Sequence, residues 1–335
     1  MDHMLLSNWF HLHSSVPSSY VQPPESRPGM VVVASGKTIP VVDLGEQDRA
    51  ETMRHILRAS EEYGFFQVIN HGISKMLMED TLNIFKEFHT MPAEEKISES
   101  SNDPNGSCRL YTSREINNKD CIQFWRDTLR HCCPPSGEFM EFWPQKPARY
   151  REVVEKYTQE LRTLGLKILE LLCEGLGLDP EYCSGGLSES PLLLAHHYPP
   201  CPEPSLTLGA PKHRDPNLVT ILLQEKDINA LQVFKDGEWI AVEPIPYAFV
   251  VNIGLLLQII SNGRLIGAEH RVVTNSGTSR TTVAYFIRPT NEKIIEPAMP
   301  LTSLGARPIY KSITLEEFLR IFMSKGPDIE PELLF

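Results

Sequence analysis

The sequence lacks the usual features of nucleic-acid-binding and disulfide-stapled proteins. Its 335 residues carry a formal net charge of −11, without a basic stripe or an interleaved aromatic and basic pattern. Nucleic acid is therefore not an expected partner. The 7 cysteines lie at irregular spacings without a C-x-x-C, which argues against both a disulfide framework and a structural zinc site.

Targeting and membrane-spanning segments are also missing. The first residues, "MDHMLLSNWFHLHSS", have no basic n-region, and the first arginine is Arg27, so neither a signal peptide nor a transit peptide is indicated. No later apolar run reaches the length that crosses a bilayer. We expect a cytoplasmic monomer that binds small molecules and has no membrane partner.

The N-terminal half divides into an arm and a helical region. Residues 1–37 are rich in Ser and Pro and predict a flexible N-terminal arm. Residues 38–190 predict a mainly helical region with flanking strands, in which apolar residues at alternating steps of three and four mark a long helix over 147–178. The polar segment 98–121 predicts a long loop.

From residue 191 to 335 the pattern changes to short β-type runs. "LVTILLQ", "AFVVNIG" and "RTTVAYFIRP" lie between turn residues, and "KDGE" marks a hairpin. We therefore predict an α+β protein with a double-stranded β-helix (jelly-roll) core, a helical N-terminal layer and a C-terminal helix.

A metal-binding pattern lies at the start of one of these runs, in "KHRDPNLVTILLQE". Side chains two apart in an extended chain point to the same face, so His213 and Asp215 can converge on one point while Arg214 points away. His270 in "GAEHRVVTN" is the best candidate for a third ligand. Two histidines and one carboxylate form the facial triad that suits Fe(II) and leaves coordination positions open. Taken alone, His-x-Asp more often marks a histidine hydrogen-bonded to a carboxylate near a turn.

A second pattern is able to bind a carboxylate. Arg280 and Thr282 in "SRTTVAYFIRP" share one face of a strand. Arg280 could pair with a surface acid; if it points into the barrel instead, its planar fork and the hydroxyl form a carboxylate socket. An open Fe(II) face beside such a socket indicates a 2-oxo acid cosubstrate.

These patterns together resemble the plant Fe(II)/2-oxoglutarate-dependent dioxygenases, as do "FFQVINHG", "MPAEEK", "YPPCPEP" and "LQVFKDGEWIAVEP". "FWRDTLRH", "KPARYREVVEKY" and "VVNIGLLLQII" look most like the branch that contains tropane-alkaloid hydroxylases. The resemblance implies iron held by His213, Asp215 and His270, and 2-oxoglutarate held by Arg280, the hydroxyl at Thr282 and Tyr198. It also implies consumption of O2, release of succinate and CO2, and ascorbate as reductant.

The chain departs from the family at two of these positions. Thr282 stands where the family usually has Ser, and the hydroxyl is retained. His196 stands where Asn is common, and either donates to the cosubstrate or fills space. Because His196 and His197 alternate across a strand, only one of them can face the barrel.

The resemblance implies hydroxylation of an unactivated C–H bond on a plant metabolite such as an alkaloid. We expect Phe286, Phe124 and Trp125 near the substrate, although aromatic residues at strand ends are more often core. Glu115, in a loop that we expect to act as a lid, is the candidate acid for an ammonium group. The alternatives are a flavonoid or phenolic substrate, an oxidase without a 2-oxo acid, a metal-dependent hydrolase or isomerase, and a non-catalytic binding protein on the same fold.

Overall fold

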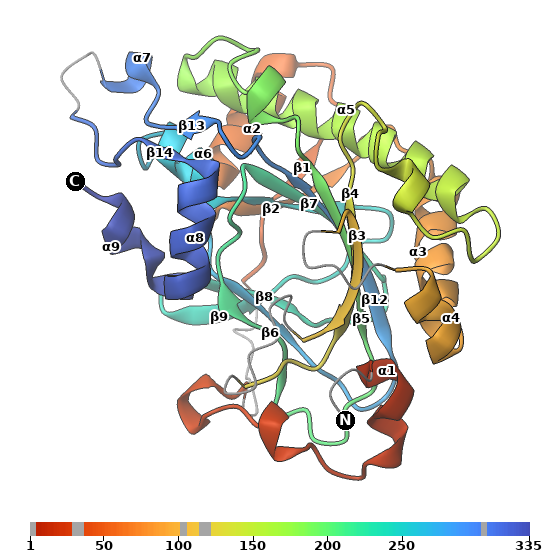
Figure 1. Ribbon diagram of the computed structural model, residues 1–335. Helices are drawn as coiled ribbons and strands as arrows, with labels where there is room; N and C mark the ends of the chain where they lie inside the picture. Colours follow the sequence, from red (N-terminus) through yellow and green to blue (C-terminus); the bar gives the residue numbers. More distant parts are fainter. Residues whose placement is uncertain (1–4, 29–36, 101–105, 114–121, 303–306) are drawn as a thin grey trace.

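Two facing β-sheets form the centre of the molecule (Figure 1). The computed structural model describes residues 5–28, 37–100, 106–113, 122–302 and 307–335. The large sheet has the order β1-β2-β10-β7-β12-β5-β4-β3, with β1 Val41–Asp43, β2 Phe65–Ile69, β3 Cys108–Thr112, β4 Asp127–Cys132, β5 Leu192–Tyr198, β7 Val219–Gln224, β10 Phe249–Ile253 and β12 Arg280–Ile287. The small sheet has the order β6-β11-β8-β9, with β6 Leu208–His213, β8 Leu231–Lys235, β9 Glu238–Ala241 and β11 His270–Val273. A short pair, β13 Ile294–Ile295 and β14 Ile313–Thr314, lies apart. The predicted α+β jelly-roll core is confirmed.

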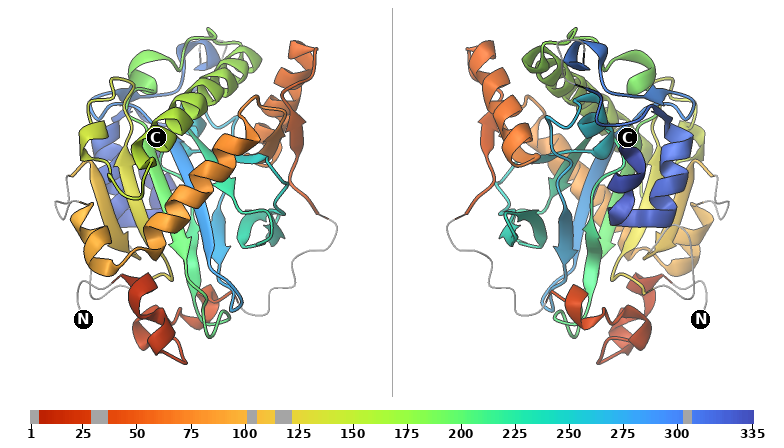
Figure 2. Two further views of the ribbon diagram at one scale, coloured as in Figure 1. Left: turned by 90° about the vertical axis from the view of Figure 1, so that its right-hand side faces the viewer. Right: turned by 90° about the vertical axis from the view of Figure 1, so that its left-hand side faces the viewer.

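Helices cover the outer face of the large sheet (Figure 2). They are α2 Arg49–Glu62, α3 Lys75–Thr90, α4 Ala93–Ser98 and α5 Tyr150–Leu176. The helix predicted over 147–178 is therefore α5, and Gly177, with a φ of 77°, ends it in the left-handed conformation. It packs closely on β12 and β7, because a Cβ at Gly165 would come within 2.1 Å of the Ile287 side chain. The largest apolar cluster fills this interface.

The later helices lie outside the two sheets of the barrel (Figure 1). They are α6 Leu255–Ile260, α7 Met299–Thr302, α8 Leu315–Lys325 and α9 Glu330–Leu333, with a 3₁₀ turn over Gly326–Ile329. The side chain of Thr314 caps α8 by accepting from the backbone N–H of Glu317. These elements supply the predicted C-terminal helix, and α8 and α9 lie together beside the barrel in Figure 1.

The described part of the N-terminal arm is packed, in contrast to the flexible arm that its composition predicts. Residues 5–28 form α1 Leu6–Trp9 and the 3₁₀ turns Phe10–Leu12, Ser18–Tyr20 and Pro24–Ser26. Leu6 and Tyr20 are buried against Trp125. This packing depends on apolar partners more than 100 positions away, which the local Ser and Pro content does not reveal.

The boundary predicted at residue 190 divides a continuous sheet. β3 and β4 belong to the first half of the chain, yet β4 pairs with β5, the first strand of the second half. β3 also lies within the segment 98–121, which was expected to be loop throughout. The cysteines of the described ranges are free thiols. No helix in these ranges is long and apolar enough to cross a membrane.

Candidate active site

His213, Asp215 and His270 meet at one end of the barrel. His213 ends β6, His270 begins β11, and the two residues are paired in the small sheet. Each histidine Nε2 lies 3.6 Å from Asp215 Oδ1. Ligand atoms of all three residues lie within 4.8 Å of one another, and theirs is the one such group of His, Cys, Asp or Glu side chains that the described residues form. The three predicted ligands are therefore brought together.

Neighbouring groups orient each ligand toward a common centre. Nδ1 of His213 lies 2.8 Å from the Pro211 carbonyl, and Nδ1 of His270 lies 3.1 Å from the Ala268 carbonyl. Because a carbonyl only accepts, each Nδ1 carries the proton and donates, which leaves Nε2 as the metal-binding lone pair.

The carboxylate of Asp215 is oriented in the same way. Its Oδ2 accepts hydrogen bonds from the Thr220 hydroxyl and the Asn252 amide, both at 2.5 Å. This leaves Oδ1, the atom nearest to both histidines, for a metal ion. Sequence reasoning missed Thr220 and Asn252, although a polar residue inside an otherwise apolar strand is a usable signal for such a role.

The protonation states suit a metal site. Burial, followed by the neighbouring His270, lowers the pKa of His213 to about 4, so its imidazole is neutral near pH 7. Burial raises the pKa of Asp215, but His270, His213 and the two hydrogen bonds outweigh burial and lower it. Two imidazole Nε2 ligand atoms and one ionised carboxylate are a donor set that fits Fe(II).

The predicted carboxylate socket faces the same cavity. Arg280 on β12 pairs with Tyr198 on β5, and Thr282 pairs with His196, so all four side chains line one wall. Arg280 is only 2% exposed, and its Nη2 donates to Gln224 Oε1 at 3.1 Å. Its Nε is buried and has no acceptor among the described residues. Since an unpaired buried donor costs about 1–3 kcal/mol, this nitrogen indicates a ligand with an acceptor oxygen.

Gly209 makes room for the tyrosine of this wall. A Cβ at Gly209 would lie 2.6 Å from Cδ1 of the Tyr198 ring. Any larger residue would therefore push the ring out of its position. Sequence reasoning did not single out this glycine.

The two adjacent histidines of β5 face opposite sides, as predicted. His196 lines the cavity, and its Nδ1 lies 2.9 Å from the Thr128 hydroxyl. Burial, followed by the positive charges of Arg126 and Arg280, holds its pKa well below the usual range, so the ring is neutral. His197 stacks on His89 at the outer face, with 4.9 Å between ring centroids.

The cavity, about 480 Å³ of open space, contains only part of the expected substrate site. Phe286 lines it. Phe124 and Trp125 are buried but do not; Trp125 packs in the N-terminal cluster and donates from Nε1 to the Pro199 carbonyl. Glu115 lies outside the described residues. Arg126, which follows Trp125 in the sequence, does line the cavity, and the sequence analysis did not predict it.

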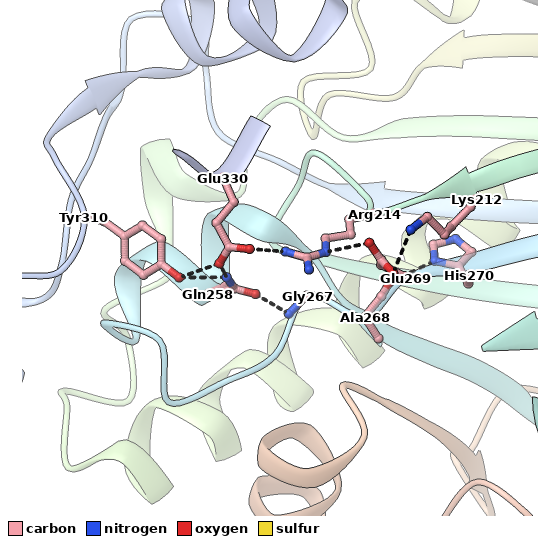
Figure 3. A network of polar contacts seen from close by, with 9 residues as sticks. All are labelled: Lys212, Arg214, Gln258, Gly267, Ala268, Glu269, His270, Tyr310 and Glu330. Atoms are coloured by element: carbon pink, nitrogen blue, oxygen red, sulfur yellow. Dashed lines mark hydrogen bonds and ion pairs between the residues drawn. The ribbon is translucent and has the colours of Figure 1, made fainter. Parts of the chain in front are cut away.

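A polar network on the outer side ties the ligand strands to the C-terminal segment (Figure 3). Arg214 lies between two ligands and points away from them, as predicted; its Nη1 donates to Glu330 at 2.7 Å, and its Nε lies 3.9 Å from Glu269. Glu269 precedes the third ligand and pairs with Lys212. Glu330 also accepts from Gln258 and Tyr310.

A jelly-roll core with a His-x-Asp…His facial triad at one end of the barrel defines a class of non-haem iron oxygenases. Residues 189–289 match the model of the 2OG-Fe(II) oxygenase superfamily, and residues 39–147 match that of the non-haem dioxygenase in morphine synthesis N-terminal region. The chain belongs to this superfamily and is a 2-oxoglutarate- and Fe(II)-dependent dioxygenase.

Its relatives act on different substrates. The chain is 41% identical to Flavanone 3-dioxygenase 2 of Oryza sativa subsp. japonica, covering 98% of this chain and 95% of that protein. It is 40% identical to Hyoscyamine 6-dioxygenase of Hyoscyamus niger, and the match covers 97% of this chain and 96% of that protein. It superposes on the crystal structure of JOX2 in complex with 2OG, Fe and JA with a TM-score of 0.89. The two sequences are 32% identical, and the match covers 99% of this chain and 98% of the other. These similar identities favour no single branch of the family. The predicted resemblance to the tropane-alkaloid hydroxylases in particular is not supported over the others.

Proposed function

We propose that the enzyme hydroxylates an unactivated C–H bond of a small plant metabolite, and that Arg280, Thr282 and Tyr198 hold the remote carboxylate of 2-oxoglutarate. The observation that supports this carboxylate socket is the Nε of Arg280, which is buried without an acceptor among the described residues. Arg280 lines the same cavity as the triad. A guanidinium fork and the hydroxyls of Tyr198 and Thr282 on the same cavity wall provide the donors that a carboxylate needs.

When bound, the iron supplies O2 activation, which converts 2-oxoglutarate to succinate and CO2 and transfers one oxygen atom to the substrate. The contribution of the chain is to position and enclose the reactants. Arg280 and Thr282 fix the orientation of the cosubstrate relative to the triad. Phe65, Leu222, Leu231, Val272 and Phe286 line the rest of the cavity with apolar surface that limits access by water.

The nature of the substrate depends on the charges around this cavity. An alkaloid would bring an ammonium group, which needs an acid or an aromatic face nearby. Among the described residues of the wall the single carboxylate is Asp215, which is turned toward the metal site. An alkaloid therefore relies on Glu115 or Phe286, whereas a flavonoid or phenolic acid does not need an acid. The wall favours the second group of substrates.

The proposed reaction is tested by measuring O2-dependent succinate release from 2-oxoglutarate in the presence of Fe(II) and ascorbate. Asp215→Ala is the control without a metal site. Panels of plant alkaloids, flavonoids and phenolic acids are then screened for a mass gain of one oxygen. Oxidation that proceeds without 2-oxoglutarate would contradict the proposal and favour the oxidase alternative.

A further inference from the structure

Arg126 is a second arginine in the wall of the active-site cavity. It directly precedes β4, which pairs with β5, and it lines the cavity together with His196, His213 and Arg280. Its positive charge lowers the pKa of both His196 and His213. The guanidinium therefore lies within electrostatic reach of the metal site as well as of the socket.

The terminal nitrogens of Arg126 have no protein partner in the described part of the chain. Its side chain donates from Nε to the Ser113 carbonyl at 3.3 Å, and it forms no ion pair with a described residue. The adjacent carboxylate, Asp127, is occupied elsewhere: it accepts from the backbone N–H groups of Leu6 and Ser7 at 2.9 and 2.8 Å and from the Thr112 hydroxyl. Successive side chains of a strand point to opposite faces, which separates Arg126 from Asp127.

The charges of the loaded site leave Arg126 uncompensated. Fe(II) carries two positive charges, Asp215 one negative, the 2-oxoglutarate dianion two negative and Arg280 one positive, so these four cancel. His196 is neutral. Arg126 is then the surplus positive charge of the described cavity wall, beside a space that must still admit the substrate.

We propose that Arg126 binds a carboxylate, or an equivalent single negative charge, of the prime substrate, so that the enzyme acts on an organic acid. This inference rests on the proposed function, because the charge count assumes that Arg280 is occupied by 2-oxoglutarate. The two terminal nitrogens of a guanidinium grip a carboxylate end-on. The apolar remainder of the substrate packs against Phe286 and the aliphatic side chains of the wall.

The test is an anaerobic calorimetric titration of the protein loaded with Fe(II) and 2-oxoglutarate. The probes are a panel of phenyl, cinnamyl and cyclohexyl skeletons, each as carboxylic acid, primary amide and amine. For at least one skeleton we expect the acid to bind roughly ten- to a hundredfold more tightly than its amide, the range of a charge-assisted hydrogen-bond pair. Amines should bind least. The absence of any acid preference, including the absence of binding, overturns the proposal.

Variants of Arg126 test whether this residue causes the preference for the acid over the amide. Arg126→Gln should remove the preference for the acid, Arg126→Lys should retain part of it, and Arg126→Glu should move it toward the amine. Arg58→Gln, which removes one exposed positive charge of α2, should leave it unchanged. An undiminished acid preference in Arg126→Gln would also overturn the proposal.

Two controls separate this inference from the proposed function. If the wild-type protein fails to release succinate from 2-oxoglutarate with Fe(II), the proposed function itself is wrong. If succinate release is intact but Arg126→Gln raises the KM for 2-oxoglutarate and leaves acid binding unchanged, Arg126 belongs to the cosubstrate site and the inference fails alone.

Discussion

Arg214 and Glu330, 116 positions apart, form an ion pair of 2.7 Å that joins the metal-ligand loop to the C-terminal segment. Glu330→Ala removes the acceptor of Arg214, Gln258 and Tyr310 together. We expect the free energy of unfolding to fall by about 1–3 kcal/mol, measured by urea denaturation. Glu332→Ala, which breaks a surface pair with Lys325, is the matched control and should cost less than about 1 kcal/mol. Equal losses in the two variants would show that the network adds no stability.

The metal ligands should be individually essential. His213→Ala, Asp215→Ala and His270→Ala should each abolish turnover while far-ultraviolet circular dichroism stays unchanged, because the two histidines lie at the ends of preformed strands and Asp215 lies two residues beyond one of them. Asp215→Glu should also be severely impaired, since one added methylene displaces the carboxylate. Near-normal turnover in an alanine variant would remove that residue from the metal site.

Asn252 should affect iron binding without being a ligand. Asn252→Ala removes one of the two donors that orient Asp215, so we expect a 10- to 100-fold loss of Fe(II) affinity in an anaerobic titration. Asn262→Ala, at an exposed turn where the side chain donates to the Arg307 carbonyl, is the control. Unchanged iron affinity in Asn252→Ala would mean that Thr220 alone fixes the carboxylate.

The cosubstrate socket is tested by substitutions of its arginine and of its threonine hydroxyl. Arg280→Lys should raise the KM for 2-oxoglutarate far more than it weakens iron binding, because an ammonium cannot reproduce the planar fork. Thr282→Ser should be nearly neutral, and Thr282→Val clearly worse. A wild-type KM in Arg280→Lys would place the socket elsewhere.

Buried neutral histidines should make the fold sensitive to acid. Burial, followed by the charge of Arg130, lowers the pKa of His131 from 6.5 to about 3, and burial lowers that of His197 to about 4. Below pH 6.5 the unfolded chain binds protons that the folded chain excludes, so stability should be level above this pH and fall as the pH drops toward 4.

The contribution of His131 to this pH dependence of stability can be measured separately. His131→Gln should flatten the dependence of the urea midpoint on pH below 6.5, even if it lowers stability at pH 7 by disrupting the 2.8 Å hydrogen bond to Tyr150. Gln159→Ala, which removes an exposed side chain of α5 that does not titrate, should leave the slope as it is. An identical slope in wild type and His131→Gln would contradict the assignment to this histidine.

Local periodicity in the sequence was enough to predict part of the fold and part of the site. Side-chain alternation in extended backbone predicted that His213 and Asp215 converge and that His196 and His197 separate, and the steps of three and four predicted α5. These patterns hold because the side-chain period of a strand or helix is set by its own backbone. The order of the motifs then predicted the jelly-roll fold and the triad.

The contacts between distant side chains could not be predicted in this way, because they depend on the folded arrangement of the strands. The pairing of β4 with β5 brought Arg126 into the cavity wall and left Phe124 and Trp125 outside it. Burial of Leu6 and Tyr20 against Trp125 packed an arm whose composition predicts flexibility. The donors to Asp215 come from β7 and β10, which follow the ligand by 5 and 37 positions. Such contacts depend on long-range strand pairing and on shared apolar burial, and neither leaves a periodic signal in the segments concerned.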